Sequence, residues 1–167
     1  MIVDFYKFQG TGNDFIMIDD RGEEFNMEDA VLIKSICERR FGIGSDGLIL
    51  LQNHEEFDFE MIFFNSTGEK STFCGNGGRC IISFAHLLGI FNKNCKFMAY
   101  DGMHEGSIDK DMVSLKMADV KEVDVREDSV VLDTGSPHLV KLVDNIKTIN
   151  VLNKGKKLRF SKEFGDY

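Results

Sequence analysis

The stretch from residue 75 to residue 88 constrains the fold more than any other part of the chain. Apolar residues recur there at helical spacing, and Gly89 follows where a helix would end, which predicts a helix. A helix with an apolar surface wider than a narrow stripe must be covered on most sides. We therefore predict an α/β fold in which a curved, largely antiparallel sheet wraps around this helix. The apolar positions are Ile81, Ile82, Phe84, Ala85, Leu87 and Leu88.

Segments of strand character lie on both sides of this helix in the sequence. Residues 57–63 alternate, with four apolar side chains on one face and Asp58 and Glu60 on the other, which predicts a half-buried strand. A second helix is expected up to Glu38, with Asn26 as its N-cap and Ala30 on its inner face. Further strands are expected at residues 2–9, 15–18, 48–51, 96–100, 104–108, 112–117 and 129–133.

Charge and hydropathy exclude several classes of partner. The chain has 167 residues, with 20 Lys and Arg against 28 Asp and Glu, for a net charge of −8. An acidic protein without a basic run is a poor binder of nucleic acid or of anionic membranes. The sequence has no long apolar run and no basic-then-apolar leader, so we expect a cytoplasmic protein without a membrane partner.

A composition shift near residue 118 predicts a domain boundary. Residues 118–128 are strongly charged, and the remainder up to residue 167 is polar and lysine-rich. That remainder lacks enough apolar residues for a core of its own. We expect a first domain over residues 1–117 and only the beginning of a second domain over residues 118–167.

The octapeptide FCGNGGRC at residues 73–80 places Cys74 where the central helix begins. Unpaired N–H groups and the helix dipole stabilise negative charge at that point, which favours a thiolate. The alternative is an ordinary buried cysteine, and the octapeptide leaves both open. The chain has four cysteines, no CxxC pair and no export signal, so we expect reduced thiols and no metal site.

Several turns end with residues suited to a small polar ligand. Asn13, Asn65 and Asn76 each offer a donor and an acceptor, which suits a zwitterionic amino acid, although turn geometry alone also explains the first two. His138 follows Gly-Ser-Pro in a turn that can present a side chain to a site. The glycine-rich stretches GTGND and GIGSDG are not strand-to-helix G-x-G-x-x-G loops, so we expect no nucleotide cofactor.

Four blocks in order resemble the diaminopimelate epimerases, which are cofactor-independent enzymes of bacterial lysine and peptidoglycan-precursor synthesis. The blocks are KFQGTGNDFIMID (7–19), RRFGIGSDGLILL (39–51), FFNSTGEKSTFCGNGGRC (63–80) and GSPHLV (135–140). The resemblance implies two similar α/β domains with a cleft between them. It also implies a two-base mechanism, in which one cysteine thiolate removes the α-proton of diaminopimelate and a second cysteine returns a proton on the opposite face.

Matched residue by residue, the resemblance assigns roles to eight positions. Cys74 takes the place of the first catalytic cysteine, and His138 matches a histidine important for activity. Gly47 stands where some members carry a substrate-binding glutamine, and Ser136 stands where many carry an asparagine. The positions that match substrate-binding residues are Asn13, Gly47, Asn65, Gly75, Asn76 and Ser136.

One departure concerns the second half of the reaction. The second cysteine of the family lies in a later part of its chains, so we expect this chain alone to be inactive. A non-catalytic remnant that binds a small amino acid is the alternative. Proline-racemase-type enzymes have histidine where Asn76 lies, and phenazine-type isomerases lack the cysteine, so both fit less well. We also expect an unpaired strand edge at Val130–Asp133, which favours a homodimer or a poorly ordered tail.

Overall fold

The computed structural model describes residues 3–162 of a chain that forms two compact units, residues 1–118 and residues 119–167. Each unit has its own sheet. The assignment of residues 1–117 to one epimerase domain and of residues 118–167 to the start of a second stays a prediction. Across the described residues, every helix is too short or too polar to cross a membrane.

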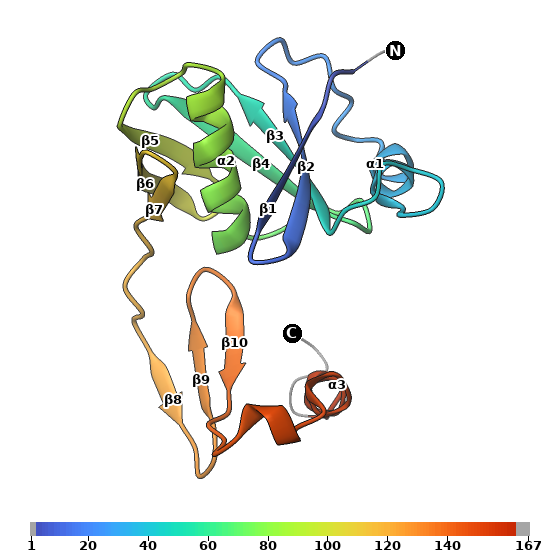
Figure 1. Cartoon of the computed structure of the whole chain (residues 1–167), viewed down its shortest axis with the longest axis vertical. Coiled ribbons are helices and arrows are strands. Elements are labelled where there is room, and N and C mark those ends of the chain that lie inside the picture. The colour runs from blue at the N-terminus through green and yellow to red at the C-terminus, as the bar shows by residue number, and fades with distance from the viewer. Residues whose placement is uncertain (1–2, 163–167) are drawn as a thin grey trace. The chain divides into compact units, whose positions relative to one another are not determined.

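Unit 1, defined as residues 1–118, is built on a seven-stranded sheet whose strands follow one another in chain order (Figure 1). The pairs β2–β3 and β4–β5 are parallel, and the other neighbours are antiparallel. The strands are β1 (Tyr6–Gly10), β2 (Asn13–Asp19), β3 (Gly47–Gln52), β4 (Phe59–Asn65), β5 (Asn94–Ala99), β6 (Gly102–Asp109) and β7 (Met112–Leu115).

Each parallel pair is joined by a helix, because parallel neighbours need a crossover connection. Helix α1 (Ala30–Cys37) joins β2 to β3, and helix α2 (Gly75–Leu87) joins β4 to β5. The two strand pairs run in opposite directions, so crossovers of the same hand place the two helices on opposite faces of the sheet. Strand β3 is therefore buried on both faces, with Ile49 in the cluster around α2 and Leu48 in the cluster around α1.

Helix α2 is enclosed by the sheet, as the sequence predicts. It contacts both edge strands, β1 and β7, as well as β2, β3, β4 and β6, so the sheet curls around it (Figure 1). Ile81, Ile82, Phe84 and Ala85 have no exposed surface, whereas Leu87 points outward and is 60% exposed. The helix ends before Gly89, whose φ of +73° is the left-handed conformation that glycine adopts without strain.

Two local predictions are wrong in detail. Helix α1 begins only at Ala30, which is exposed, and its N-cap is Asp29, whose side chain accepts a hydrogen bond of 2.9 Å from the N–H of Leu32. Strand β4 is not half-buried, because Ile62 and Phe64 on its second face pack in the cluster around α1. The alternation of residues 57–63 reports only the face that packs against α2.

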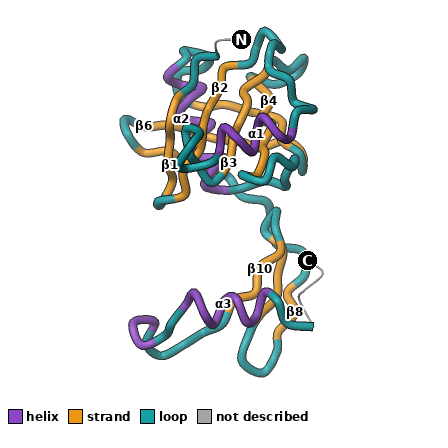
Figure 2. The backbone as a smooth tube through the Cα atoms, turned by 90° about the vertical axis from the view of Figure 1, so that its right-hand side faces the viewer, coloured by secondary structure: helices purple, strands orange, loops and turns teal. Residues whose placement is uncertain are grey.

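Unit 2, defined as residues 119–167, contains a small antiparallel sheet in the order β10-β9-β8 (Figure 1), and Figure 2 shows its strands in orange and helix α3 in purple. Strand β9 is paired on both sides, so the predicted unpaired edge at Val130–Asp133 is wrong. None of its residues up to residue 162 is fully buried, in line with its polar composition. The elements are β8 (Val123–Val125), β9 (Val130–Asp133), β10 (Pro137–Val140), a 3₁₀ helix (Ile146–Thr148) and α3 (Val151–Arg159).

Candidate active site

Cys74 is the N-cap residue of α2, with extended backbone angles (φ −117°, ψ 116°). Its carbonyl oxygen accepts the N–H of Gly78 at 2.7 Å, which is the first bond of the helix. The N–H groups of residues 75–77 therefore have no acceptor within the helix, and the Cys74 side chain does not cap them. These three donors, with the positive end of the helix dipole, form a place for an anionic group beside a half-buried thiol.

The turn between β1 and β2 lies against the start of α2. Residues 11 and 12 both have positive φ, and a β-carbon on Gly10 would lie 3.2 Å from the carbonyl oxygen of Asn76. This close approach brings Asn13 to the thiol. The Oδ1 atom of Asn13 lies 3.7 Å from Cys74 Sγ and accepts a hydrogen bond of 3.3 Å from Asn76 Nδ2.

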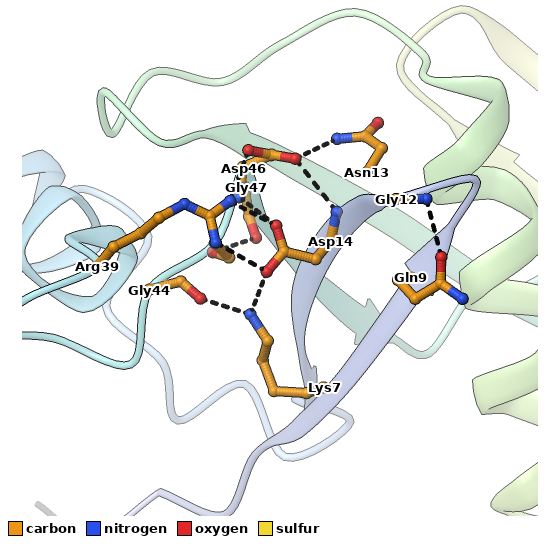
Figure 3. A network of polar contacts seen from close by, with 10 residues as sticks. Lys7, Gln9, Gly12, Asn13, Asp14, Arg39, Gly44, Asp46 and Gly47 are labelled. Atoms are coloured by element: carbon orange, nitrogen blue, oxygen red, sulfur yellow. Dashed lines mark hydrogen bonds and ion pairs between the residues drawn. The ribbon is translucent and has the colours of Figure 1, made fainter.

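A polar network lies behind Asn13 (Figure 3). Asn13 Nδ2 donates to Asp46 at 2.9 Å, and the Arg39 guanidinium donates to Asp46 at 2.8 Å and to both Asp14 oxygens at 2.7 and 3.2 Å. Lys7 pairs with Asp14 at 2.7 Å. The network joins β1, β2 and the segment before β3, and it holds the Nδ2 end of the Asn13 side chain.

Ion pairing in this network shifts the pKa values of two side chains, Asp14 and Arg39. The hydrogen bond from Arg39, helped by Lys7, holds the pKa of the Asp14 carboxyl well below its usual range. The hydrogen bonds to Asp14 and Asp46 raise the pKa of Arg39 above its usual value. Asp14 therefore stays ionised across the physiological pH range.

Three of the four cysteines are buried, and Cys74 is not. Burial raises the pKa of the Cys37 thiol, raises that of Cys80 to about 11 and raises that of Cys95 to about 12. These thiols are protonated at neutral pH and out of reach of a ligand in solution. Cys74 alone combines exposure with a helix N-terminus.

Two glycines of the octapeptide serve packing. A β-carbon on Gly77 would lie 3.0 Å from the side chain of Ile49, and one on Gly78 would lie 2.7 Å from the ring of Phe73. Gly75 has room, with the nearest side-chain atoms at 3.7 Å. The glycines thus let α2 lie close to the sheet. Gly47 is similar, because a β-carbon there would lie 2.6 Å from the carbonyl oxygen of Phe64.

The predicted site residues of unit 1 gather at one end of the sheet. Asn13 begins β2, and Gly47 begins the parallel strand β3 and pairs with Asn65 at the end of β4. Cys74 follows a few residues later at the start of α2. The register therefore brings Asn65 and Gly47 to the same end of the sheet as Asn13 and the thiol.

Two predicted site residues, Ser136 and His138, belong to unit 2. His138 Nδ1 lies 2.7 Å from the carbonyl oxygen of Ser136 and 3.2 Å from the hydroxyl of Thr134, and the His138 side chain is exposed. These contacts hold the ring within its own turn. The role of both residues in catalysis or binding stays a prediction.

The charged residues behind Asn13 are not predicted by the sequence pattern. Lys7, Asp14, Arg39 and Asp46 all fall within the two blocks at residues 7–19 and 39–51. The available signal for these residues was their position, because the two acidic and two basic residues lie in the same blocks as Asn13 and Gly47. The pairing itself depends on the β2–β3 register, which the sequence does not state.

Comparisons with known proteins identify the family of the chain. The family model described as diaminopimelate epimerase matches residues 5–123. The chain belongs to the diaminopimelate epimerase family. It is 50% identical over 161 residues to the diaminopimelate epimerase of Flavobacterium psychrophilum, covering 96% of this chain and 63% of that protein. It is 39% identical to that of Chlorobaculum tepidum, covering 92% of this chain and 63% of that protein.

Solved structures agree on the fold of this epimerase-family chain. A phenazine biosynthesis protein of the PhzF family from Bacillus anthracis superposes with a TM-score of 0.65 at 14% identity, covering 87% of this chain and 56% of that one. A putative phenazine biosynthesis protein from Clostridium difficile gives 0.58 at 14% identity, covering 94% and 65%. The family is one of isomerases of lysine biosynthesis. The chain spans about 63% of the length of these two curated relatives.

Proposed function

We propose that the chain supplies one half of a cofactor-independent diaminopimelate epimerase, in which Cys74 exchanges a proton with the α-carbon of the substrate. The observation that carries this proposal is the place of Cys74 at the start of α2, beside three free N–H donors and the side chains of Asn13 and Asn76. The activity belongs to lysine biosynthesis, and the proposed location is the cytoplasm.

The chemistry follows from the donors around the thiol. An α-proton is very weakly acidic, so its removal requires stabilisation of the charge that develops on the substrate carboxylate. In the proposal, the N–H groups of Gly75 and Asn76 hold that carboxylate while the Cys74 thiolate takes the proton and becomes a thiol. The electron pair stays on the α-carbon and its carboxylate. Asn13 and Asn65 bind the remaining polar groups of the substrate, and Gly47 offers backbone only.

Inversion needs a second acid on the opposite face of the α-carbon, which delivers a proton and becomes the base of the reverse reaction. Cys37, Cys80 and Cys95 are buried and do not suit this role. The two curated relatives are longer than this chain, and we propose that the second cysteine lies in the part of the enzyme that they have in addition. The 167-residue chain alone is then expected to exchange the α-proton slowly on one face without inverting it.

The test incubates the chain with LL- and meso-diaminopimelate in deuterated water and follows deuterium uptake and stereochemistry separately. Cys74→Ala is the test variant, and Cys80→Ala is the matched control for loss of a thiol on the same helix. The proposal is supported if the wild type and Cys80→Ala take up deuterium with retained configuration of the substrate and Cys74→Ala takes up none. Uptake equal in wild type and Cys74→Ala refutes the role of Cys74, and inversion by the chain alone refutes the two-thiol mechanism.

A further inference from the structure

The amide of Asn13 is held in one orientation by a carboxylate. Asn13 Nδ2 lies 2.9 Å from Asp46 Oδ2, and a carboxylate oxygen only accepts hydrogen bonds. The backbone N–H of Asp14 donates to the same oxygen at 3.2 Å, and Arg39 donates to the other oxygen at 2.8 Å. The Asp14 N–H and the Arg39 guanidinium thus hold the Asp46 carboxylate in place, and this carboxylate can accept a hydrogen bond only from the nitrogen of the Asn13 amide.

A guanidinium sets the opposite end of the same hydrogen-bond chain. Arg79 donates to Asn76 Oδ1. A guanidinium only donates, so Asn76 must present its oxygen to Arg79 and its nitrogen to Asn13. Asn76 Nδ2 accordingly faces Asn13 Oδ1 at 3.3 Å.

We propose that Asp46 and Arg79 are positioning residues that together fix the Asn13 amide with its oxygen, and not its nitrogen, toward the Cys74 thiol. Neither charged group is hydrogen-bonded to the thiol, so both act through the two amides. The hydrogen bonds run in one sense from Arg79 through Asn76 and Asn13 to Asp46. The resulting acceptor lies 3.7 Å from Cys74 Sγ.

The orientation matters because it opposes the helix dipole. The start of α2 favours a thiolate at Cys74, whereas an acceptor oxygen favours the protonated thiol. On the proposed function, the same oxygen receives the S–H group that forms when the thiolate takes the α-proton. A reversed amide would place a donor at the sulfur and make the thiolate a weaker base.

The test compares two variants that carry the same charge. In an Arg39→Met/Arg79→Met background, where Asn76 is released and no guanidinium competes for the new amide, Asp46→Asn keeps an acceptor oxygen toward Asn13, because the Asp14 N–H selects the oxygen end of that amide. Asp46→Leu has similar size and no acceptor, so Asn13 is free to turn its N–H toward the thiolate. The readout is the pH dependence of Cys74 alkylation, resolved by peptide mapping.

The proposal predicts that the midpoint of the alkylation curve lies about one pH unit lower for Asp46→Leu than for Asp46→Asn, the size of one charge-assisted hydrogen bond. With Asn13→Leu added, the two midpoints coincide. Equal midpoints without that change overturn the proposal. In the unaltered protein, hydrogen exchange of the Asn13 side-chain amide, followed by NMR, is expected to be at least tenfold slower than that of the exposed Asn92. Equal rates also overturn it.

This test does not depend on turnover. If the wild-type chain takes up no deuterium from solvent while the midpoints differ as predicted, the proposed function fails and the positioning stands. If deuterium uptake is lost only in Cys74→Ala while the midpoints coincide, the function stands and the positioning fails.

Discussion

Replacement of Gly78 by alanine is expected to destabilise unit 1, although alanine is the better helix former. The added β-carbon would lie 2.7 Å from Cζ of Phe73 and 2.9 Å from Cδ2 of Leu115. Phe73 is only 4% exposed and its ring is stacked on His104 with centroids 3.8 Å apart, so the ring cannot move aside freely. The strain therefore has to be taken up by α2 or by the core around it.

The expected size follows from two opposing effects. Glycine-to-alanine exchange inside a helix stabilises by about 1 kcal/mol. Overpacking of a closely packed core costs about 1–3 kcal/mol. The net change expected for Gly78→Ala is a loss of about 1 kcal/mol in the free energy of unfolding. Gly75→Ala is the matched control on the same helix, because its β-carbon would have no atom closer than 3.7 Å.

Urea unfolding followed by circular dichroism measures both variants. Gly75→Ala is expected to match or slightly exceed the wild-type midpoint, and Gly78→Ala to fall below it. Because Phe73 directly precedes Cys74, Gly78→Ala is also expected to change the alkylation rate of that thiol. A Gly78→Ala protein as stable as Gly75→Ala would refute the steric argument, since it would mean that the core yields to a methyl group at no cost.

Three further outcomes are expected. Under limiting electrophile Cys74 is alkylated first, and peptide mapping that finds a buried cysteine labelled earlier would contradict this assignment. The hydrogen bond from Arg39 is the main cause that lowers the pKa of Asp14 in the folded protein below 3.8, so ionised Asp14 stabilises the fold above about pH 4 and this stabilisation is lost as the pH falls. The urea midpoint should therefore fall less steeply between pH 6 and pH 3 in Arg39→Gln than in the wild type. An equal pH dependence in the two proteins would count against the ion pair. Gly89→Ala, at φ +73° with free space around it, should lower the unfolding free energy by about 1 kcal/mol, and an unchanged urea midpoint would show that the left-handed turn is not needed.

The central part of the fold is predictable because its signals are long and periodic. The helix at residues 75–88 and the apolar strand at Leu48 are strong patterns, and the broad apolar surface of α2 correctly predicts that a sheet encloses it. Unit 2 gives weaker signals. Strand β8 is short, exposed and lies within a charged stretch, and α3 has Gly155 and several lysines where an apolar stripe would be needed.

The sequence predicts several candidate residues of the site, but it does not predict the hydrogen bonds between them. Asn13, Asn76 and Cys74 carry visible functional groups beside turns and a helix start, so the sequence identifies them. Asp46 and Arg39 look like ordinary surface charges until the parallel β2–β3 register brings them beside Asn13. Likewise, the packing role of Gly78 requires knowing which ring lies above it.

The enclosure of α2 between both edge strands has a consequence for how the thiol site is lost. A helix held by the whole sheet cannot detach alone, so its central amides are expected to exchange with solvent only when unit 1 unfolds globally. Core substitutions far from Cys74 will then reduce the fraction of molecules that carry an intact thiol site while leaving each surviving site unchanged. Titration of reactive thiols counts the molecules with an intact site, and so separates a loss of such molecules from a change in the reactivity of Cys74.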